Sequence, residues 1–217
     1  MNRFITNKAL VLRVRNQGES NREAFFLNAE MGIIRAVVYG GPKSRLRSYV
    51  SPFHSGILYL YHDPVRDSYK VSDFDVIKWR PGIRENYERT VIAGAIAETI
   101  LAGDGGGSNC QDAARLAGLS YDALENAGIE HAERILIHFL WNWTDILGAR
   151  PEFEDEASCI SIKNPGALHW LKVIENLEPA LLVRYSLDEI SLNYAKSLCL
   201  DILASTLGRH LSSWENI

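Results

Sequence analysis

Residues 55–79, SGILYLYHDPVRDSYKVSDFDVIKW, contain two apolar runs separated by a turn, and this pattern decides the fold of the first part of the chain. Asp63-Pro64 ends the first run, because proline cannot donate to a strand ladder, and the second run begins at Asp67. Three similar runs precede this stretch and each ends at glycine, at residues 8–18, 22–32 and 33–41. Five short strands with Gly, Asn and Asp between them predict a small antiparallel barrel or sandwich. An OB-type barrel fits this length, and the number of strands by itself leaves an SH3-like barrel open.

The pattern changes at Arg80-Pro81-Gly82, beyond which apolar residues recur with the period of a helix. Helices are expected within residues 85–103, 109–118, 129–148, 167–177 and 186–211. The glycine-rich stretch 103–109 predicts a flexible break, because consecutive glycines have no side chains to fix a conformation. We therefore expect an α+β chain of two domains. Residues 1–80 are expected to form the small barrel, and residues 81–217 are expected to form an all-α domain.

Charge is divided unequally along the chain. The formal net charge is -4, yet residues 1–80 carry 13 Lys and Arg against 7 Asp and Glu, while the remainder carries 10 against 20. A basic first third joined to an acidic remainder indicates two units with different partners. The basic unit is the candidate for binding a polyanion.

The stretch 40–49, GGPKSRLRSY, is the strongest candidate for a phosphate contact. Lys43, Arg45 and Arg47 stand at every second position, so an extended segment would point all three the same way. A helix would instead bring Lys43 and Arg47 onto one face, so the cations are expected to cluster in either case. Ser44 adds a hydroxyl donor. The complete predicted set is Arg13, Arg15, Arg35, Lys43, Ser44, Arg45, Arg47, Arg66 and Lys70.

Aromatic residues accompany these cations and could stack on nucleic-acid bases. Most of them are expected in the barrel core or at its rim, since aromatics alternate in any β core. They are Tyr39, Tyr49, Phe53, Tyr59, Tyr61 and Tyr69.

Other kinds of chemistry find little support. The sequence contains no nucleotide-binding G-K-[ST] motif, no nucleophile elbow and no zinc-deaminase motif, so we expect no catalysis and no cofactor. His131 and His138 are seven positions apart, which indicates polar residues on a helix surface rather than a metal pair. Three widely spaced cysteines predict neither a disulfide framework nor a zinc site. With no signal-peptide pattern and no long apolar window, we expect a cytoplasmic protein without membrane contact.

The chain resembles the RecO family of bacterial recombination mediators. The resemblance is carried by residues 40–71, GGPKSRLRSYVSPFHSGILYLYHDPVRDSYKV, where a glycine turn leads to K-S-R-L, a Pro-Phe step, a strand and R-D-x-Y. The opening residues 8–41 and the closing GRHLSSWENI support it. It implies an N-terminal OB-fold and a C-terminal helical domain. It also implies a nucleoid-associated protein that binds single- and double-stranded DNA, anneals complementary strands and, with RecR, helps to load RecA onto DNA coated by single-strand-binding protein (SSB).

Two implications of the resemblance concern the helical half. Many family members carry a four-cysteine zinc module there, but this chain has only Cys159 in the corresponding 151–166 loop, so no zinc is expected. The acidic C-terminal tail of SSB would need local cations. The candidates are Lys172, Arg184, Lys196 and Arg209. Two other functions stay open from the residues alone: an RNA-binding OB module, and a protein-interaction scaffold without nucleic-acid contact.

Overall fold

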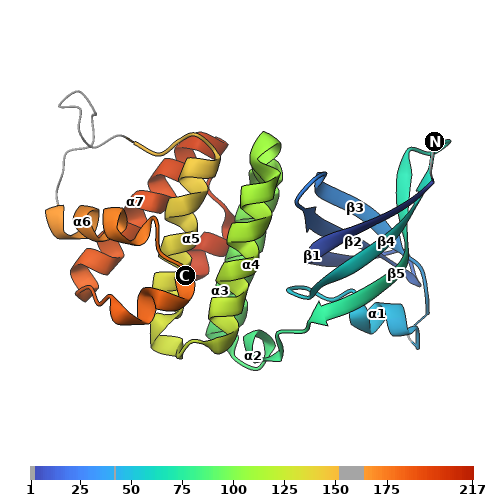
Figure 1. Ribbon diagram of the computed structural model, residues 1–217, viewed down its shortest axis with the longest axis horizontal. Coiled ribbons are helices and arrows are strands. Elements are labelled where there is room, and N and C mark those ends of the chain that lie inside the picture. The colour runs from blue at the N-terminus through green and yellow to red at the C-terminus, as the bar shows by residue number, and fades with distance from the viewer. Residues whose placement is uncertain (1–2, 42, 152–163) are drawn as a thin grey trace. The chain divides into compact units, whose positions relative to one another are not determined.

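The computed structural model describes residues 3–41, 43–151 and 164–217. Its first part is a closed five-stranded barrel with strand order β1-β2-β3-β5-β4, as Figure 1 shows. The strands are β1 (Phe4–Gln17), β2 (Asn21–Asn28), β3 (Gly32–Val38), β4 (Ser55–Asp63) and β5 (Ser68–Lys78). Every pairing is antiparallel except that of β3 with β5. The prediction of five strands forming an OB-type barrel, followed by helices, is confirmed.

The barrel core is built by alternation along the strands. Four fully buried side chains point inward: Val11, Phe26, Leu58 and Phe74. The ring centres of Phe26 and Phe74 lie 6.0 Å apart. Burial of each such side chain stabilises the fold by about 1.5–3 kcal/mol.

A β-bulge in β1 decides which way its cations point. Val11 pairs with Phe26 and Arg13 with Phe25, so Leu12 is an extra residue on β1. In a regular strand without this bulge, Arg13 would point inward like Val11, because side chains alternate along a strand. The bulge instead returns Val14 to the core side and leaves Arg13 and Arg15 outside.

The segment between β3 and β4 contains a short helix, α1 (Arg45–Tyr49). Its apolar side chains Leu46 and Tyr49 pack on the barrel core, and Val50 follows them with an exposed fraction of 1%. Ser44 occupies the N-cap position without donating or accepting a side-chain capping bond. Part of the GGPKSRLRSY stretch is therefore helical because apolar residues within it close one end of the barrel.

The glycine-rich stretch, expected to be a flexible break, is a packed 3-10 segment, η1 (Asp104–Asn109). Gly105 and Gly106 are buried and have φ of 65° and 84°, values that glycine adopts without steric strain. A Cβ atom on Gly105 would lie 2.9 Å from Cγ1 of Ile33 on β3. Nearby, the thiol of Cys110 lies 3.2 Å from the carbonyl oxygen of Ala29. The glycines here permit close approach to the barrel rather than freedom of movement.

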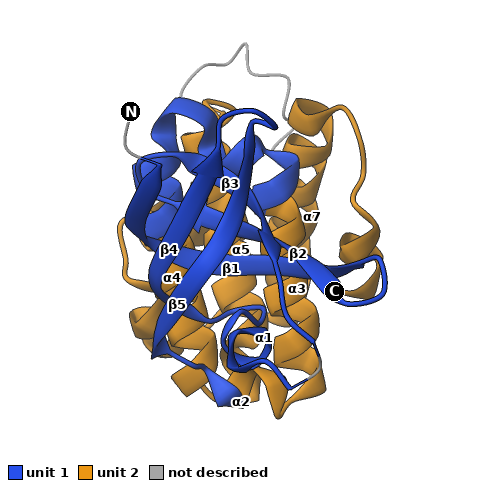
Figure 2. Cartoon of the chain, turned by 90° about the vertical axis from the view of Figure 1, so that its right-hand side faces the viewer, with its two compact units in different colours: residues 1–81, 100–115 blue, residues 82–99, 116–217 orange. Residues whose placement is uncertain are grey.

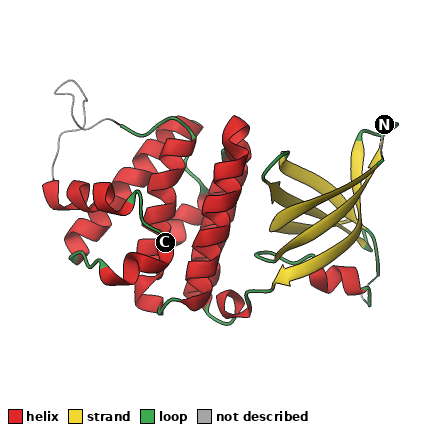
Figure 3. Ribbon diagram, in the orientation of Figure 1, coloured by secondary structure: helices red, strands yellow, loops and turns green. Residues whose placement is uncertain are grey.

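Two compact units divide the chain, and Figure 2 colours them separately. The unit that contains the barrel comprises residues 1–81 together with 100–115, and the other comprises residues 82–99 and 116–217. Strands are confined to the barrel, and the rest of the described chain is helical, as Figure 3 shows. The longer helices are α3 (Tyr87–Ala102), α4 (Cys110–Asn126), α5 (Ala132–Ile146), α6 (Pro165–Ile174) and α7 (Glu189–Leu207). The shorter ones are α2 (Pro81–Arg84), η2 (Ile129–His131), η3 (Pro179–Arg184) and η4 (Ser212–Asn216).

Helix α5 is the centre of the helical unit. Leu136, Phe139, Leu140 and Trp143 are fully buried, and the rings of Phe139 and Trp143 stack at 5.5 Å. Helices α6 and α7 and segment η3 all contact α5. None of the described helices has the length and apolar character needed to cross a membrane.

His138 lies within this core, with an exposed fraction of 2%, so the expectation of a surface residue is wrong for it. Nearly every position of α5 from Ile135 to Thr144 is buried, because other elements surround the helix on several sides. The His138 Nε2–H donates to the carbonyl of Leu177 at 2.9 Å. Burial lowers the pKa of His138 to about 4; the Leu177 carbonyl opposes this shift and the charge of Arg150 adds to it. His131 stays partly exposed beside Glu130.

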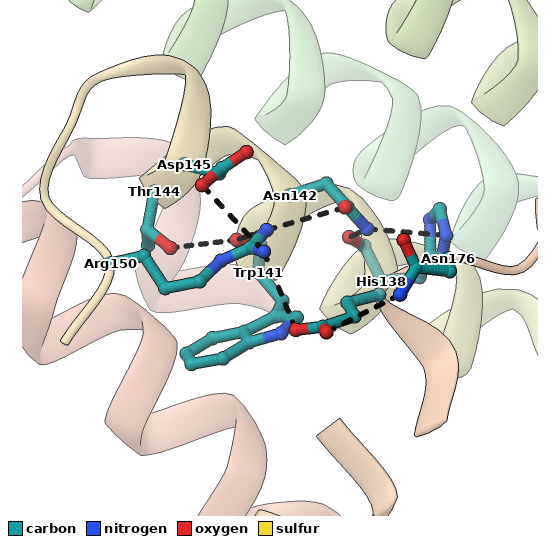
Figure 4. Close-up of polar contacts among 8 residues, drawn as sticks. His138, Trp141, Asn142, Thr144, Asp145, Arg150 and Asn176 are labelled. Carbon is teal, nitrogen blue, oxygen red and sulfur yellow. Dashed lines mark hydrogen bonds and ion pairs between the residues drawn. The ribbon is translucent and has the colours of Figure 1, made fainter. Parts of the chain in front are cut away.

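Arg150 ties the end of α5 to the residues that follow α6, as Figure 4 shows. Its guanidinium lies 3.4 Å from the Glu175 carboxylate and 3.7 Å from that of Asp145. It also donates to the carbonyl of Trp141 and to Oδ1 of Asn142, and lies 5.0 Å from the centre of the Trp141 ring. The Arg150 side chain is only 20% exposed, so it joins the last turns of α5 to Glu175 from a mostly buried position.

Candidate nucleic-acid interface

A single row of outward-facing residues runs round the barrel. The strand registers pair Phe4 with Tyr61, Tyr61 with Lys70, Lys70 with Val37, Val37 with Glu23, and Glu23 with Arg15. Residues paired across neighbouring strands lie on the same side of a sheet, so all six members face away from the core. We call this set the outer row. One end of it carries arginine and the other carries aromatic rings.

The arginine end is organised by a buried carboxylate. Glu23 accepts hydrogen bonds from Nε of Arg15 and from Nε of Arg35, one arginine on each side of β2. The Glu23 side chain is 4% exposed, whereas those of Arg15 and Arg35 are 50% and 61% exposed. Burial by itself raises the pKa of Glu23, but the two guanidinium groups outweigh burial and hold its pKa below the usual value.

This geometry leaves the outer ends of both guanidinium groups directed to solvent. Since Nε of each arginine is bound to Glu23, the terminal Nη groups stay available for a second acceptor. Arg15 also lies over the ring of Phe25, 5.3 Å from its centre, which restrains the side chain further. Two fixed, outward guanidinium groups form a suitable site for a phosphate, which arginine binds in a bidentate way.

Arg13 belongs to the neighbouring row. It pairs with Phe25, which in turn pairs with Arg35, so Arg13, Arg15 and Arg35 share one face of β1, β2 and β3. The sequence-based prediction placed these three in one phosphate-binding set, and the registers bring them together.

A groove of about 500 Å³ lies beside the arginine pair. It is lined by the outer part of β3, the end of β1 and the start of β5, with Gln17, Glu23, Arg35, Val37 and Tyr69 among its walls. The β1–β2 turn and the β4–β5 turn therefore flank it. In OB-folds, the strand 2–3 face between these two loops is where oligonucleotides bind.

The extended alternative, in which Lys43, Arg45 and Arg47 all point the same way, is wrong, because both arginines lie on helix α1. They are two positions apart on helix α1, and residues at that spacing do not face each other. Arg45 lies 3.5 Å from Asp73 and 5.2 Å from the ring centre of Tyr49. Lys43 is exposed in the turn before the helix, where the helical-face argument does not apply.

Arg47 lies near Arg22. Arg22 was not among the DNA-binding residues predicted from the sequence. Arg22 donates to the Arg47 carbonyl oxygen at 3.3 Å. Burial and then the nearby charge of Arg47 lower the pKa of Arg22. Arg22 was missed because its position at the start of an apolar strand gave no sign that a later loop would return to it.

The last two predicted barrel cations lie near the β4–β5 turn. Arg66 is exposed in the turn itself, and its amide lies 3.4 Å from the Asp63 carboxylate. The Lys70 ammonium lies 3.7 Å from Asp63 and between two tyrosine rings, at 5.8 Å from Tyr61 and 6.0 Å from Tyr39. Lys70 is a member of the outer row, whereas Arg66 borders it.

The four cations considered for an acidic tail lie on different elements of the helical unit. Lys172 is on α6, Arg184 ends η3, Lys196 is on α7 and Arg209 follows α7. The Lys196 ammonium is engaged by Glu133 of α5 at 2.6 Å.

Two pockets of the helical unit carry carboxylates rather than cations. Glu88 and Glu133 line a pocket of about 280 Å³, and Asp122 and Glu178 line another of about 250 Å³. Neither pocket carries the positive charge that an acidic peptide would need.

Side chains that could bind a metal are scattered through the described part of the chain. No three His, Cys, Asp or Glu side chains among residues 3–41, 43–151 and 164–217 lie close enough together to hold an ion. Cys110 is partly buried beside Ala29, and burial raises the pKa of the Cys199 thiol. Cys159 and most of the 151–166 loop lie outside the described residues. The donor set of a four-cysteine zinc module does not fit the three cysteines of this chain.

Comparison with known proteins places the barrel in a family. Residues 1–80 match the family model described as Recombination protein O N terminal. The match ends two residues beyond the last strand, so it covers the whole barrel. No curated protein matches the chain. Residues 1–80 therefore carry the N-terminal domain of the RecO family of recombination and DNA-repair proteins.

Proposed function

We propose that this protein is a recombination mediator that binds single- and double-stranded DNA and anneals complementary strands. In the same proposal it acts with RecR to help load RecA onto single-stranded DNA coated by SSB. The family match carries the repair role. The observation that supports direct DNA contact is the pair Arg15 and Arg35, fixed by Glu23 at the edge of the OB-fold groove.

The division of charge supports a division of labour. The barrel supplies cations on its outer face, whereas the part after residue 80 has twice as many acidic as basic residues and is a poor surface for DNA. We assign the barrel to DNA and the helical domain to protein partners, among them RecR and the SSB tail, with RecA an indirect partner. A cytoplasmic, nucleoid-associated location follows from this role.

The direct test is a titration of fluorescein-labelled oligonucleotide, followed by anisotropy at several salt concentrations. Replacing Arg15 and Arg35 together by Ala should weaken binding to both single strands and duplex. The slope of log affinity against log salt should fall by about 1.4 for single strands, since two phosphate contacts are lost. The matched control replaces Lys8 and Lys78, exposed barrel cations that do not line the groove. An unchanged slope in the arginine variant, or an equal loss in the control, would contradict the assignment.

Annealing of complementary oligonucleotides gives the functional readout. The wild-type chain should speed annealing, and the Arg15/Arg35 variant should lose most of that effect. Competition between DNA and RNA of the same sequence separates the proposal from an RNA-binding role. If the wild-type chain binds no nucleic acid at low salt, the scaffold alternative holds and the proposal fails.

A further inference from the structure

Two tyrosine rings lie near Lys70 at the far end of the outer row, and Phe4 contacts one of them. Phe4 pairs with Tyr61 across β1 and β4, and Tyr61 pairs with Lys70 across β4 and β5. Tyr39 follows β3, and its ring centre lies 6.0 Å from the Lys70 ammonium. We call Phe4, Tyr39, Tyr61 and Lys70 the aromatic patch.

Phe4 and Tyr39 of this patch are exposed and Tyr61 is partly buried, although aromatic side chains usually serve the core of a barrel. Phe4 is 64% exposed and Tyr39 is 47% exposed. Phe4 and Tyr61 contact each other edge to face, with ring centres 5.5 Å apart. None of these three residues belongs to the barrel's buried cluster, which contains Phe26 and Phe74 and has Tyr49 and Tyr69 packed against it. The exposed rings therefore do not stabilise the inside of the barrel.

Cations stand among the rings. Lys70 lies 5.8 Å from the Tyr61 ring centre, and Arg3 Nη1 lies 3.4 Å from the Tyr61 hydroxyl. Asp63 neutralises part of this charge, since its carboxylate lies 3.7 Å from Lys70. Exposed rings with interleaved cations are the combination that single-stranded nucleic acids require, because bases stack on rings and phosphates pair with the cations.

We propose that the aromatic patch binds the unpaired bases of a DNA strand whose phosphates are held by Arg15 and Arg35. This inference rests on the proposed function and adds to it a means of distinguishing single strands from duplex. The bases of a duplex are stacked on one another and offer no free face to Phe4, Tyr39 or Tyr61. Duplex DNA therefore uses the arginine end of the outer row, and a single strand uses both ends.

The strand registers make the two ends continuous. Lys70 of the patch pairs with Val37, and Val37 pairs with Glu23, which binds Arg15 and Arg35. From Phe4 to Arg15 the outer row crosses five strand-to-strand steps, which span about 24 Å along the surface at about 4.8 Å per step. That length suits a site of about four nucleotides, at the lower end of the range for OB-folds.

The experiment compares three labelled ligands of equal length with the full chain: oligo(dT), an abasic strand with the same phosphates, and a duplex. The test variant replaces Phe4 and Tyr39 by Ala. Both side chains are largely exposed, so folding should be retained, and Tyr61→Phe serves as a second variant that keeps the ring. The matched control is Tyr87→Ala, which removes an 80% exposed ring from the helical unit.

Wild-type protein should bind oligo(dT) more tightly than the abasic strand by about tenfold or more, given the usual strength of base–aromatic stacking. Phe4→Ala with Tyr39→Ala should remove most of that difference while leaving the abasic strand and the duplex within about twofold of wild type. Tyr61→Phe and Tyr87→Ala should preserve it.

Two results would overturn the inference while the proposed function stands: equal wild-type affinity for oligo(dT) and the abasic strand, or an unchanged difference in the double variant. If the wild-type protein binds none of the three ligands, the proposed function itself is refuted. The Arg15/Arg35 variant completes the set of proteins, because it should weaken the binding of all three ligands alike.

Discussion

Arg15 on β1 and Arg35 on β3 donate from Nε to the same carboxylate, that of Glu23 on the strand between them. Their positions follow from the registers, which place Arg15 opposite Glu23 and Arg35 opposite Phe25. Two like charges are thereby held near each other at a half-exposed surface. The carboxylate neutralises part of their repulsion and fixes the direction of both guanidinium groups.

Replacing Glu23 by Gln tests whether this carboxylate positions the arginines for DNA. Removal of a negative charge by itself predicts tighter DNA binding. Loss of positioning predicts weaker binding, and we expect weaker binding. We also expect a decrease of about 1–3 kcal/mol in the free energy of unfolding, since charged hydrogen bonds are lost. Urea denaturation and DNA anisotropy measure the two effects. Glu19→Gln, the same charge change at an exposed turn residue, should tighten DNA binding slightly, and an identical response in both variants would refute positioning.

The cations of the GGPKSRLRSY stretch should contribute less to DNA affinity than Arg15 and Arg35. Arg45 is paired with Asp73, and it lies on the opposite side of α1 from Arg47. Joint replacement of Lys43, Arg45 and Arg47 by Ala should therefore reduce DNA affinity less per charge removed than replacement of Arg15 and Arg35. Salt titrations of the two variants check this ranking. A steeper loss in the loop variant would return the main phosphate contact to the GGPKSRLRSY stretch.

His138 should make the helical unit sensitive to mild acid. Its folded-state pKa, about 4, lies below the ordinary value of 6.5, so between these values the unfolded chain binds a proton that the folded chain does not. The contribution is fully present above pH 6.5 and is lost as the pH falls toward 4, by about 3 kcal/mol in total. His138→Gln, which retains a donor for Leu177, should flatten the pH dependence of unfolding in that window. His169→Gln, the same replacement at an exposed histidine, is the control.

Arg150 should stabilise the helical unit. Arg150→Met keeps much of the side-chain volume but removes the bonds to Glu175, Asp145 and the carbonyl of Trp141. We expect a loss of about 2–3 kcal/mol in unfolding free energy, measured by urea denaturation followed by circular dichroism. DNA binding by the barrel should not change. Arg184→Ala, at an exposed arginine, is the control, and a loss of equal size there would mean that the network around Arg150 contributes nothing specific.

Replacing Gly105 by Ala should destabilise the protein more than the same replacement at Gly208, which has the same backbone conformation but open space around it. Gly105 has φ of 65°, and Gly208 at the end of α7 has φ of 67°, with no atom within 4 Å of the position that an added Cβ would occupy. Ala at position 208 should cost about 1 kcal/mol for the left-handed conformation. Ala at position 105 should cost more, because its Cβ would overlap Ile33. Ile33→Val combined with Gly105→Ala should recover part of the difference, and thermal unfolding measures all four proteins.

Much of the fold could be predicted from local patterns in the sequence. The five strand runs, the change of period at Pro81 and the unequal charge of the two parts each depend on residues close together along the chain. The exposure of Arg13, Arg15 and Arg35 on the barrel surface was also predictable, since cations on the strands of a small basic barrel are exposed by default. These features need only propensity, periodicity and composition.

Tertiary structure decided the rest, because each remaining feature depends on register or on packing between distant segments. The bulge at Leu12 turned Arg13 and Arg15 outward, and the strand registers placed Glu23 beneath its two arginines. Contact with Ile33 converted an apparently flexible glycine run into a packed segment, and the surrounding helices buried His138. The sequence by itself determined which residues form strands and helices and where charge is concentrated. Only the closed barrel decided which of those charges share a surface, since cross-strand neighbours are set by hydrogen-bond register and not by distance along the chain.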